Sequence, residues 1–117
     1  MFASLNVIMK MYAKITEFEE HHQLMAKYAK LLSHPARLAI IQLLAQKNTC
    51  ISGDIANELP LSRTTVSQHL QELKNAGLIK GTIEGLTICY CLNMTELQKM
   101  KQIFDTFLDI NIKNQNC

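Results

Sequence analysis

Residues 61–78, LSRTTVSQHLQELKNAGL, constrain the fold most, because they read as a helix with a defined start and a defined end. The apolar residues at helical spacing form one stripe: Val66, Leu70 and Leu73. Ser62 can cap the first turn, and Gly77 can enter the left-handed conformation that ends a helix cheaply. The spacing predicts a helix from about Ser62 to Asn75 that buries one face.

The opposite face of this helix carries hydroxyl, amide and cationic side chains, with no Asp or Glu near its amino end. Such a face suits a DNA major groove, where Gln can bond to adenine and Arg to guanine. A plain surface helix with a polar side is the alternative interpretation. The candidate base-reading residues are Thr64, Ser67, Gln68 and Gln71. The other candidate DNA-binding residues are Arg63, Thr65, His69, Lys74 and Lys80.

These candidates differ in their expected roles. Arg63 could read a guanine or grip phosphate, and Lys74 and Lys80 are phosphate candidates. His69 is expected to make either a phosphate contact or a half-buried hydrogen bond.

The flanking segments place this helix in a larger motif. Upstream, SGDIANELPL predicts a short helix from about Ser52 to Glu58 and then a tight connection, which together form a helix-turn-helix. Downstream, LIKGTIEGLTICYCLN alternates apolar and polar residues on both sides of Glu84–Gly85, the pattern of a two-stranded hairpin. The predicted fold class is therefore mainly α with a small β-wing, a winged helix-turn-helix.

Three segments carry a family resemblance: LSHPARLAIIQLL, DIANELPLSRTTVSQHLQELKNAGLI and ICYCLN. In this order and spacing, they resemble the ArsR/SmtB family of winged-helix repressors over most of the chain. The resemblance implies a cytoplasmic homodimer that represses transcription from a pseudo-palindromic operator. It also implies release of the DNA by a small inducer, frequently a metal or metalloid.

Length and composition set independent limits. A chain of 117 residues suits one domain, and its net charge of +2 leaves DNA affinity to the local placement of Lys and Arg. We expect an extension at residues 1–13, one domain at 14–112 and a flexible tail at 113–117. No signal peptide or membrane span is recognised, so a cytoplasmic location is expected. Catalytic arrangements are absent from the sequence pattern, and we expect no enzyme.

Both terminal helices have more apolar surface than one small domain needs. A long helix is expected from Thr16, with Glu19 completing a capping box, to Leu32. Pro35 then opens a second helix, and Asn93 with Glu96 opens the last one. The terminal helices are therefore predicted to form a homodimer interface, the alternative being that they only cover the core of one subunit.

Four cysteines, Cys50, Cys89, Cys91 and Cys117, fit thiol chemistry or small buried apolar residues better than structural disulfides. Side chains alternate along strand 88–92, so both strand thiols are expected on one face, away from the core. In winged-helix folds of this type, the segment with Cys50 pairs with this strand, so we expect Cys50, Cys89 and Cys91 to converge. Three thiols would suit As(III), Cu(I), Zn(II) with a fourth ligand, or oxidation.

The sequence departs from the two best-known sensor sites of the family. The third-helix site uses a Cys-x-Cys pair, of which only Cys50 is present, and the last-helix site uses histidine, which residues 95–117 lack. His21 and His22 are expected to be packed or exposed rather than metal ligands, and His34 is expected to be structural. No cofactor is required, and As(III), Cu(I), Zn(II) or a sulfur oxidant would act as effector. Two alternatives remain open: a winged-helix regulator that senses nothing, and a winged-helix protein-interaction module.

Overall fold

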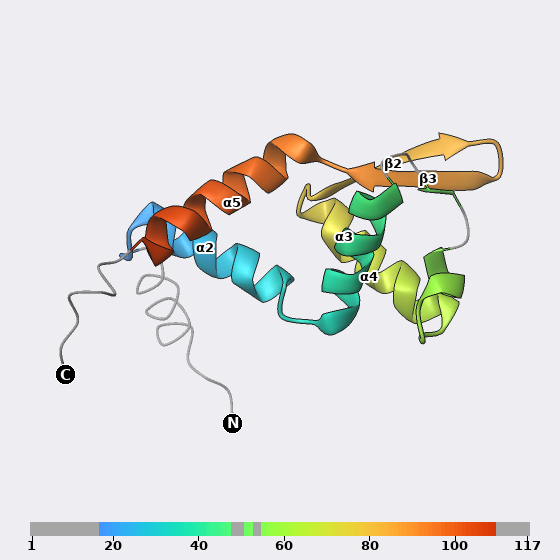
Figure 1. The fold of residues 1–117 in the computed structure, drawn as a ribbon, viewed down its shortest axis with the longest axis horizontal. Coiled ribbons are helices and arrows are strands. Elements are labelled where there is room, and N and C mark those ends of the chain that lie inside the picture. Colours follow the sequence, from blue (N-terminus) through green and yellow to red (C-terminus); the bar gives the residue numbers. More distant parts are fainter. Residues whose placement is uncertain (1–16, 48–50, 53–54, 110–117) are drawn as a thin grey trace, which may run out of the picture.

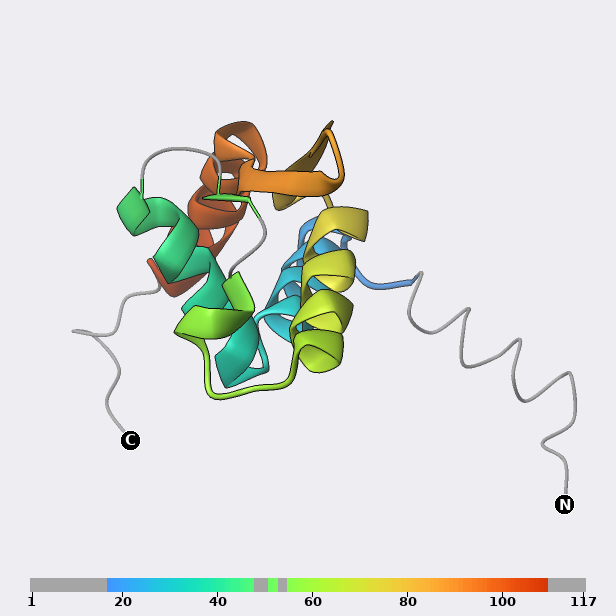
Figure 2. The same ribbon diagram turned by 90° about the vertical axis from the view of Figure 1, so that its right-hand side faces the viewer.

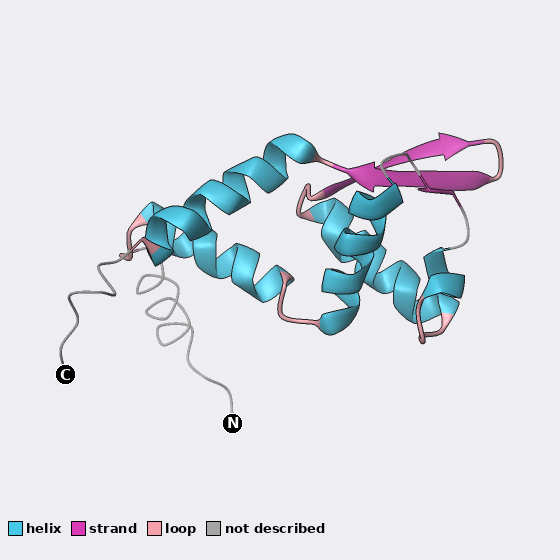
Figure 3. Cartoon of the chain, viewed as in Figure 1, coloured by secondary structure: helices cyan, strands magenta, loops and turns pink. Residues whose placement is uncertain are grey.

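Two long helices lie side by side and project from a body that contains the helix-turn-helix and the sheet (Figure 1). The computed structural model describes residues 17–47, 51–52 and 55–109. The expected extension 1–13 and tail 113–117 lie outside the described residues. The elements, coloured by type in Figure 3, are α2 (Glu20–Leu31), α3 (Pro35–Lys47), β1 (Ile51–Ser52), η1 (Ile55–Glu58), α4 (Arg63–Asn75), β2 (Ile79–Glu84), β3 (Thr87–Leu92) and α5 (Met94–Leu108).

The core lies where α3, α4 and the base of the hairpin meet. Its most deeply buried side chains come from these elements: Ile40, Val66, Leu73, Leu78 and Ile79. The predicted stripe of the 62–75 helix is thus confirmed, since all three of its members are buried. Burial of apolar side chains at this junction is the main force that holds the helix-turn-helix and the hairpin together.

The ends of α4 follow the local signals in the sequence. Ser62 is the N-cap and its hydroxyl oxygen accepts the backbone N–H of Thr65 at 3.2 Å. At the other end, Gly77 takes a φ of 82°, and the N–H of Leu78 donates to the carbonyl of Leu73 at 3.0 Å. A residue with a side chain would be strained at that φ, so the glycine sets the end of the helix.

The sheet is antiparallel in the order β1-β3-β2, and Figure 2 shows the hairpin from its tip. Glu84 pairs with Thr87, so the two turn residues are Gly85, with a φ of 63°, and Leu86. The turn therefore lies one residue later than the predicted Glu84–Gly85. The short strand predicted at residues 49–51 beside the second wing strand is confirmed at Ile51, which pairs with Tyr90 in β1, while residues 49 and 50 lie outside the described part of the chain.

Sheet pairing also shortens the first helix of the helix-turn-helix. We expected a helix from Ser52, but Ser52 pairs with Cys89 in the sheet and cannot also be helical. What forms is η1, a 3₁₀ helix of four residues, Ile55–Glu58. Ile55 is buried and Leu59 packs against the core, as predicted.

Helices α2 and α5 form an arm that extends away from the wing (Figure 1). The Tyr28 hydroxyl donates to Glu96 Oε2 at 3.2 Å and joins the two helices. Burial, together with the adjacent Glu96 carboxylate, raises the pKa of the Tyr28 phenol, so this hydroxyl keeps its proton. No helix among the described residues is both long enough and apolar enough to cross a membrane.

The starts of the two arm helices differ in how well the sequence predicts them. The N-cap of α2 is Glu19, whose side chain makes no cap bond, so the predicted Thr16–Glu19 capping box is wrong. Gln23 instead stabilises the start of α2, because its side-chain amide donates to the carbonyl of Phe18 at 2.8 Å. Asn93 does cap α5 as predicted, accepting the N–H of Glu96 at 3.5 Å.

Asn93 also fixes both ends of the hairpin. Its backbone N–H donates to the carbonyl of Leu78, and its side-chain amide donates to the carbonyl of Gly77, each at 2.9 Å. The residue that ends β3 is therefore bonded to the segment that leads into β2. These bonds hold the base of the wing independently of its tip.

Candidate nucleic-acid interface

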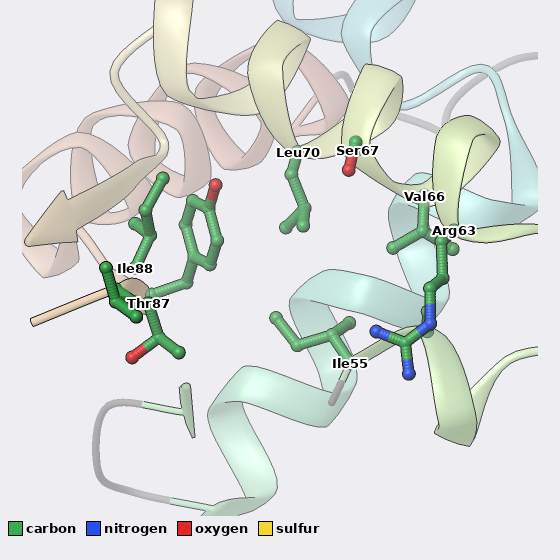
Figure 4. Close-up of a pocket in the computed structure, with 10 residues that line it drawn as sticks. Ile55, Arg63, Val66, Ser67, Leu70, Thr87 and Ile88 are labelled. Carbon is green, nitrogen blue, oxygen red and sulfur yellow. The ribbon is translucent and has the colours of Figure 1, made fainter. Parts of the chain in front are cut away.

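The helix-turn-helix is packed so that one side of α4 faces η1 and the other faces outward. Figure 4 shows Ile55 of η1 across from Val66 and Leu70 of α4, around a hollow of about 410 Å³. Ser67 and Arg63 come from the same helix, and Ile88 of β3 lies on the far side of the hollow. Because α3, η1 and β2 pack against α4, the rest of its surface is presented to solvent, and this includes Ser67 and Arg63 at the hollow.

The outward side of α4 carries the four predicted base-reading side chains, and all of them are exposed: Thr64, Ser67, Gln68 and Gln71. The Gln71 amide donates to Asn75 Oδ1 at 2.9 Å, which aligns it along the helix. Within the described part of the chain, Ser67 and Gln68 make no side-chain hydrogen bond, so their donors and acceptors face solvent. Exposed amides and hydroxyls on a helix can bond the edges of base pairs.

Thr65 has a structural position instead. It is half-buried in the first turn, where the Ser62 hydroxyl donates to Thr65 Oγ1 at 2.9 Å and accepts the Thr65 N–H. The hydroxyl groups of both residues are thus engaged with each other. This pairing fixes the start of α4, and we now expect Thr65 to position the helix rather than to touch DNA.

The predicted cations lie at both ends of the outward face. Arg63 is exposed in the first turn of α4, and Lys74 is exposed in its last turn. The stem of Lys74 lies over β2, since its Cε is 3.5 Å from where a Cβ on Gly81 would be. Lys80 belongs to β2 itself and is exposed. The structure thus gives exposed Lys and Arg side chains on the helix and on the adjacent strand, which suits contacts with phosphates.

His69 lies against the start of α3, half-buried, rather than on the outward face. Its Nδ1 accepts the Nε–H of Arg37 at 3.2 Å, and its ring centroid is 4.3 Å from that of His34. Burial lowers the pKa of His69, and the nearby charges of His34 and Arg37 lower it further, against the opposing effect of Glu72. The half-buried hydrogen bond, one of the two predicted roles, is thus present, and the phosphate contact stays a prediction.

The expectation that His34 is structural is confirmed. Its Nδ1 accepts the backbone N–H of Ala36 at 3.0 Å, which caps the first turn of α3. The Arg37 contact with His69 was missed by sequence reasoning. The run LSHPARL places Arg37 one helical turn after His34, but no sequence pattern near Arg37 indicates which helix its guanidinium contacts.

The two strand cysteines, predicted to share one face of β3 away from the core, are less exposed than that prediction implies. Cys89 is buried, with 4% exposure, and Cys91 is half-buried. Because Cys89 is buried, the prediction that both thiols lie away from the core is wrong for Cys89. Tyr90 and Leu92 do pack against the core as predicted. Cys50 and Cys117 lie outside the described residues.

Three potential metal ligands do cluster elsewhere among the described residues. One ligand atom from each of Glu19, His21 and His22 lies within 4.8 Å of the others, and all three side chains are exposed. His21 Nδ1 is 3.2 Å from a Glu19 carboxylate oxygen. Both histidines were expected to be packed or exposed, and both are exposed.

The tip of the wing carries exposed apolar side chains in addition to the predicted turn residues. Ile83 and Leu86 are exposed beside Glu84, and Leu86 is fully exposed in the turn. The carboxylate of Glu84 would meet phosphate unfavourably, so the expectation that the tip does not enter a minor groove stays a prediction.

Comparisons with known proteins agree with this architecture. Residues 32–82 match a family model described as a helix-turn-helix domain. The HTH-type transcriptional regulator Rv2034 of Mycobacterium tuberculosis is 37% identical over 76 residues, which cover 65% of this chain and 70% of that protein.

Two solved structures share the fold. One, described as a possible transcriptional regulator for arsenical resistance, is 28% identical with a TM-score of 0.62 and covers 72% of this chain and 86% of its own. An ArsR-like transcriptional regulator from Rhodococcus sp. RHA1 is 26% identical with a TM-score of 0.59, covering 71% of this chain and 77% of its own. These relatives are regulators and not enzymes. The winged helix-turn-helix, the run of matched motifs and these relatives together establish that the chain belongs to the ArsR/SmtB family of winged helix-turn-helix transcriptional regulators.

Proposed function

We propose that this regulator is a cytoplasmic repressor that binds a pseudo-palindromic operator as a homodimer, with one α4 helix in each of two successive major grooves. The exposed amide and hydroxyl face of α4 carries this proposal. Thr64, Ser67, Gln68 and Gln71 read base edges, and the half-sites lie about 34 Å apart, one turn of the duplex. Arg63 reads a guanine or holds phosphate, and Lys74 and Lys80 hold phosphate.

A homodimer is proposed because the arm leaves apolar surface exposed. No residue of α5 is buried, and Phe107 and Leu108 are 42% and 57% exposed. A hollow of about 650 Å³ between α2 and α5 is lined by Met25, Ile103 and Phe107 among others. Exposed apolar patches of this kind mark protein contacts, and the family resemblance implies a second copy as the partner.

The test of base reading compares two variants of exposed residues. Gln68→Ala is expected to weaken operator binding by about 1–3 kcal/mol and to relax base preference, since it removes a bidentate contact. Lys80→Ala is expected to weaken operator and random DNA alike, because a phosphate contact carries no sequence information. Fluorescence anisotropy with the protein's own promoter DNA, compared with a shuffled duplex, separates the two.

Equal losses on both duplexes for Gln68→Ala would contradict its role in reading bases. If the unmodified protein binds neither duplex in a salt-dependent way, the protein-interaction module becomes the better interpretation.

We also propose that thiol chemistry at Cys50, Cys89 and Cys91 releases the operator. Cys91 is half-buried and Cys89 is buried on β3, whose neighbour β1 precedes η1 and α4 in the chain. Binding of As(III), Cu(I) or Zn(II), or oxidation, would change how β1 and β3 pair, and a coupling of a few kcal/mol (~1–3) is enough to lower DNA affinity.

Arsenite tests this switch. We expect one equivalent per subunit to release promoter DNA from the reduced protein, and Cys91→Ser to bind DNA normally yet no longer respond. Cys89→Ser is the second variant, with its folding checked by circular dichroism because Cys89 is buried. A Cys91→Ser protein that arsenite still releases would remove Cys91 from the mechanism, and an unresponsive unmodified protein would leave a repressor with another effector or none.

A further inference from the structure

One guanidinium joins three helices beside the middle of α4. Arg37, in the first turn of α3, donates from Nε to His69 Nδ1 at 3.2 Å and from Nη1 to the carbonyl of Leu31 at 3.3 Å. Leu31 is the last residue of α2, and His69 lies midway along α4. Hydrogen bonds from a single side chain therefore connect the arm with the DNA-facing helix.

The direction of the Arg37–His69 bond fixes the state of the imidazole. A guanidinium has only donors, so His69 Nδ1 must offer a lone pair, and the ring must be neutral with its proton on Nε2. A protonated imidazole has donors on both nitrogens and cannot accept this bond. The link between α3 and α4 thus exists in one protonation state of His69 only.

We propose that Arg37 and His69 are positioning residues for operator recognition: together they hold α4 at the angle that presents its outward face, and protonation of His69 releases that hold and weakens operator binding. The proposal rests on the proposed binding of operator DNA. It assigns to His69 a role through Arg37 and not a contact with phosphate.

The charges around His69 reinforce this behaviour. From α3 and the residues before it, the ring faces Arg37 and His34, and from its own helix it faces Glu72. Lys27 and Lys30 of α2 line the same hollow of about 450 Å³ as Arg37 and Glu72. A protonated His69 would therefore lie near more cationic side chains than carboxylates, since Glu72 is the one carboxylate among the groups named here.

The sign of the pH effect follows from the lowered pKa of His69. The ordered state, with the Arg37 bond made, binds the proton less readily than a state in which the bond is broken. The stabilising effect of the Arg37–His69 bond is complete above the ordinary pKa of histidine. It is lost as the pH falls toward the lowered pKa of His69. A phosphate contact would act in the opposite direction, because a protonated imidazole binds an anion more tightly.

The experiment measures operator affinity by anisotropy from about pH 7.5 to about pH 5.5, the range in which an imidazole ordinarily titrates. Three proteins are compared: the unmodified chain, His69→Asn and Arg37→Lys. Asn keeps an acceptor near the position of Nδ1 but does not titrate, and Lys keeps the charge but loses the planar fork of donors.

We expect the unmodified protein to lose about three- to fivefold in affinity relative to His69→Asn across this range, a fall set by the fraction of His69 that takes up a proton. Arg37→Lys is expected to bind more weakly at neutral pH and to show less of this dependence. The same pH dependence in His69→Asn, or a gain of affinity on acidification that His69→Asn lacks, would overturn the proposal.

A second readout needs no DNA. Nitrogen-15 spectra of the free protein at neutral pH are expected to show His69 Nδ1 unprotonated and Nε2 protonated, and the opposite tautomer would overturn the proposal. If the unmodified protein fails to bind the operator at neutral pH, the proposed function fails, and the tautomer still reports on the Arg37 contact.

Discussion

Leu73 shows no solvent exposure, although it belongs to the helix whose other face carries the candidate DNA contacts. Ile40 of α3 is equally buried, and the two belong to the same core cluster. The stability of the domain and the orientation of its DNA-facing helix thus depend on the same few side chains. Removing one of these side chains leaves a space that a packed interior fills only in part.

Leu73→Ala is expected to lower the free energy of unfolding by about 2–5 kcal/mol, the usual cost of truncating a fully buried leucine. Urea unfolding followed by circular dichroism measures this. Leu38→Ala is the matched control, because Leu38 is also helical but 49% exposed, and we expect it to change stability by less than about 1 kcal/mol. Similar losses in both variants would contradict the central position of Leu73.

At the same scale, His69 and Cys89 show why sequence patterns predict some site residues and not others. The exposure of Ser67 and Gln68 follows from helical periodicity, which depends on neighbours within one helix. The contact of His69 with Arg37 depends instead on where α3 crosses α4, which no local pattern states. Cys89 is buried as well, and strand alternation alone says nothing of what covers either face of β3.

At the scale of elements, the helix ends set by local chemistry were predicted and those set by pairing were not. α4 runs from the Ser62 cap to the Gly77 stop, and α5 begins at Asn93, because each signal acts within one turn of backbone. η1 is shorter than expected, since β3 takes Ser52 into the sheet. The start of α2 is the exception, since a local bond sets it and it was not predicted: the side chain of Gln23 bonds Phe18 where a capping box was expected.

At the scale of the whole molecule, the arm formed by α2 and α5 determines how two copies could be joined. The described chain spans extents of 49 × 48 × 25 Å, and α2 and α5 extend away from the wing (Figure 1). Two copies joined through these arms would place their α4 helices apart from each other, as two half-sites on one duplex require. The spacing of the operator halves would then be set by the arm rather than by the helix-turn-helix.

Phe107→Glu is expected to dissociate the proposed dimer, because it places a charge on the apolar side of α5, where the Phe107 ring packs edge to face with the His22 ring. Light scattering after gel filtration should then report the 13.3 kDa chain mass in place of twice that value. Gln98→Glu adds the same charge at an exposed position off the apolar stripe and should leave the dimer intact. An unmodified protein that elutes as a monomer would contradict the proposed interface.

The two bonds that Asn93 makes to the start of the hairpin also bear on how such proteins can diverge. Because the base of the wing is fixed there, residues added or removed around Gly85 and Leu86 extend or shorten a loop in solvent, and each doubling of a flexible loop costs only about 0.6 kcal/mol. Nothing lies within 4 Å of where a Cβ on Gly85 would be. The tip can therefore vary in length and charge from one lineage to another while the fold beneath it stays the same, which makes the wing the part of this domain freest to evolve.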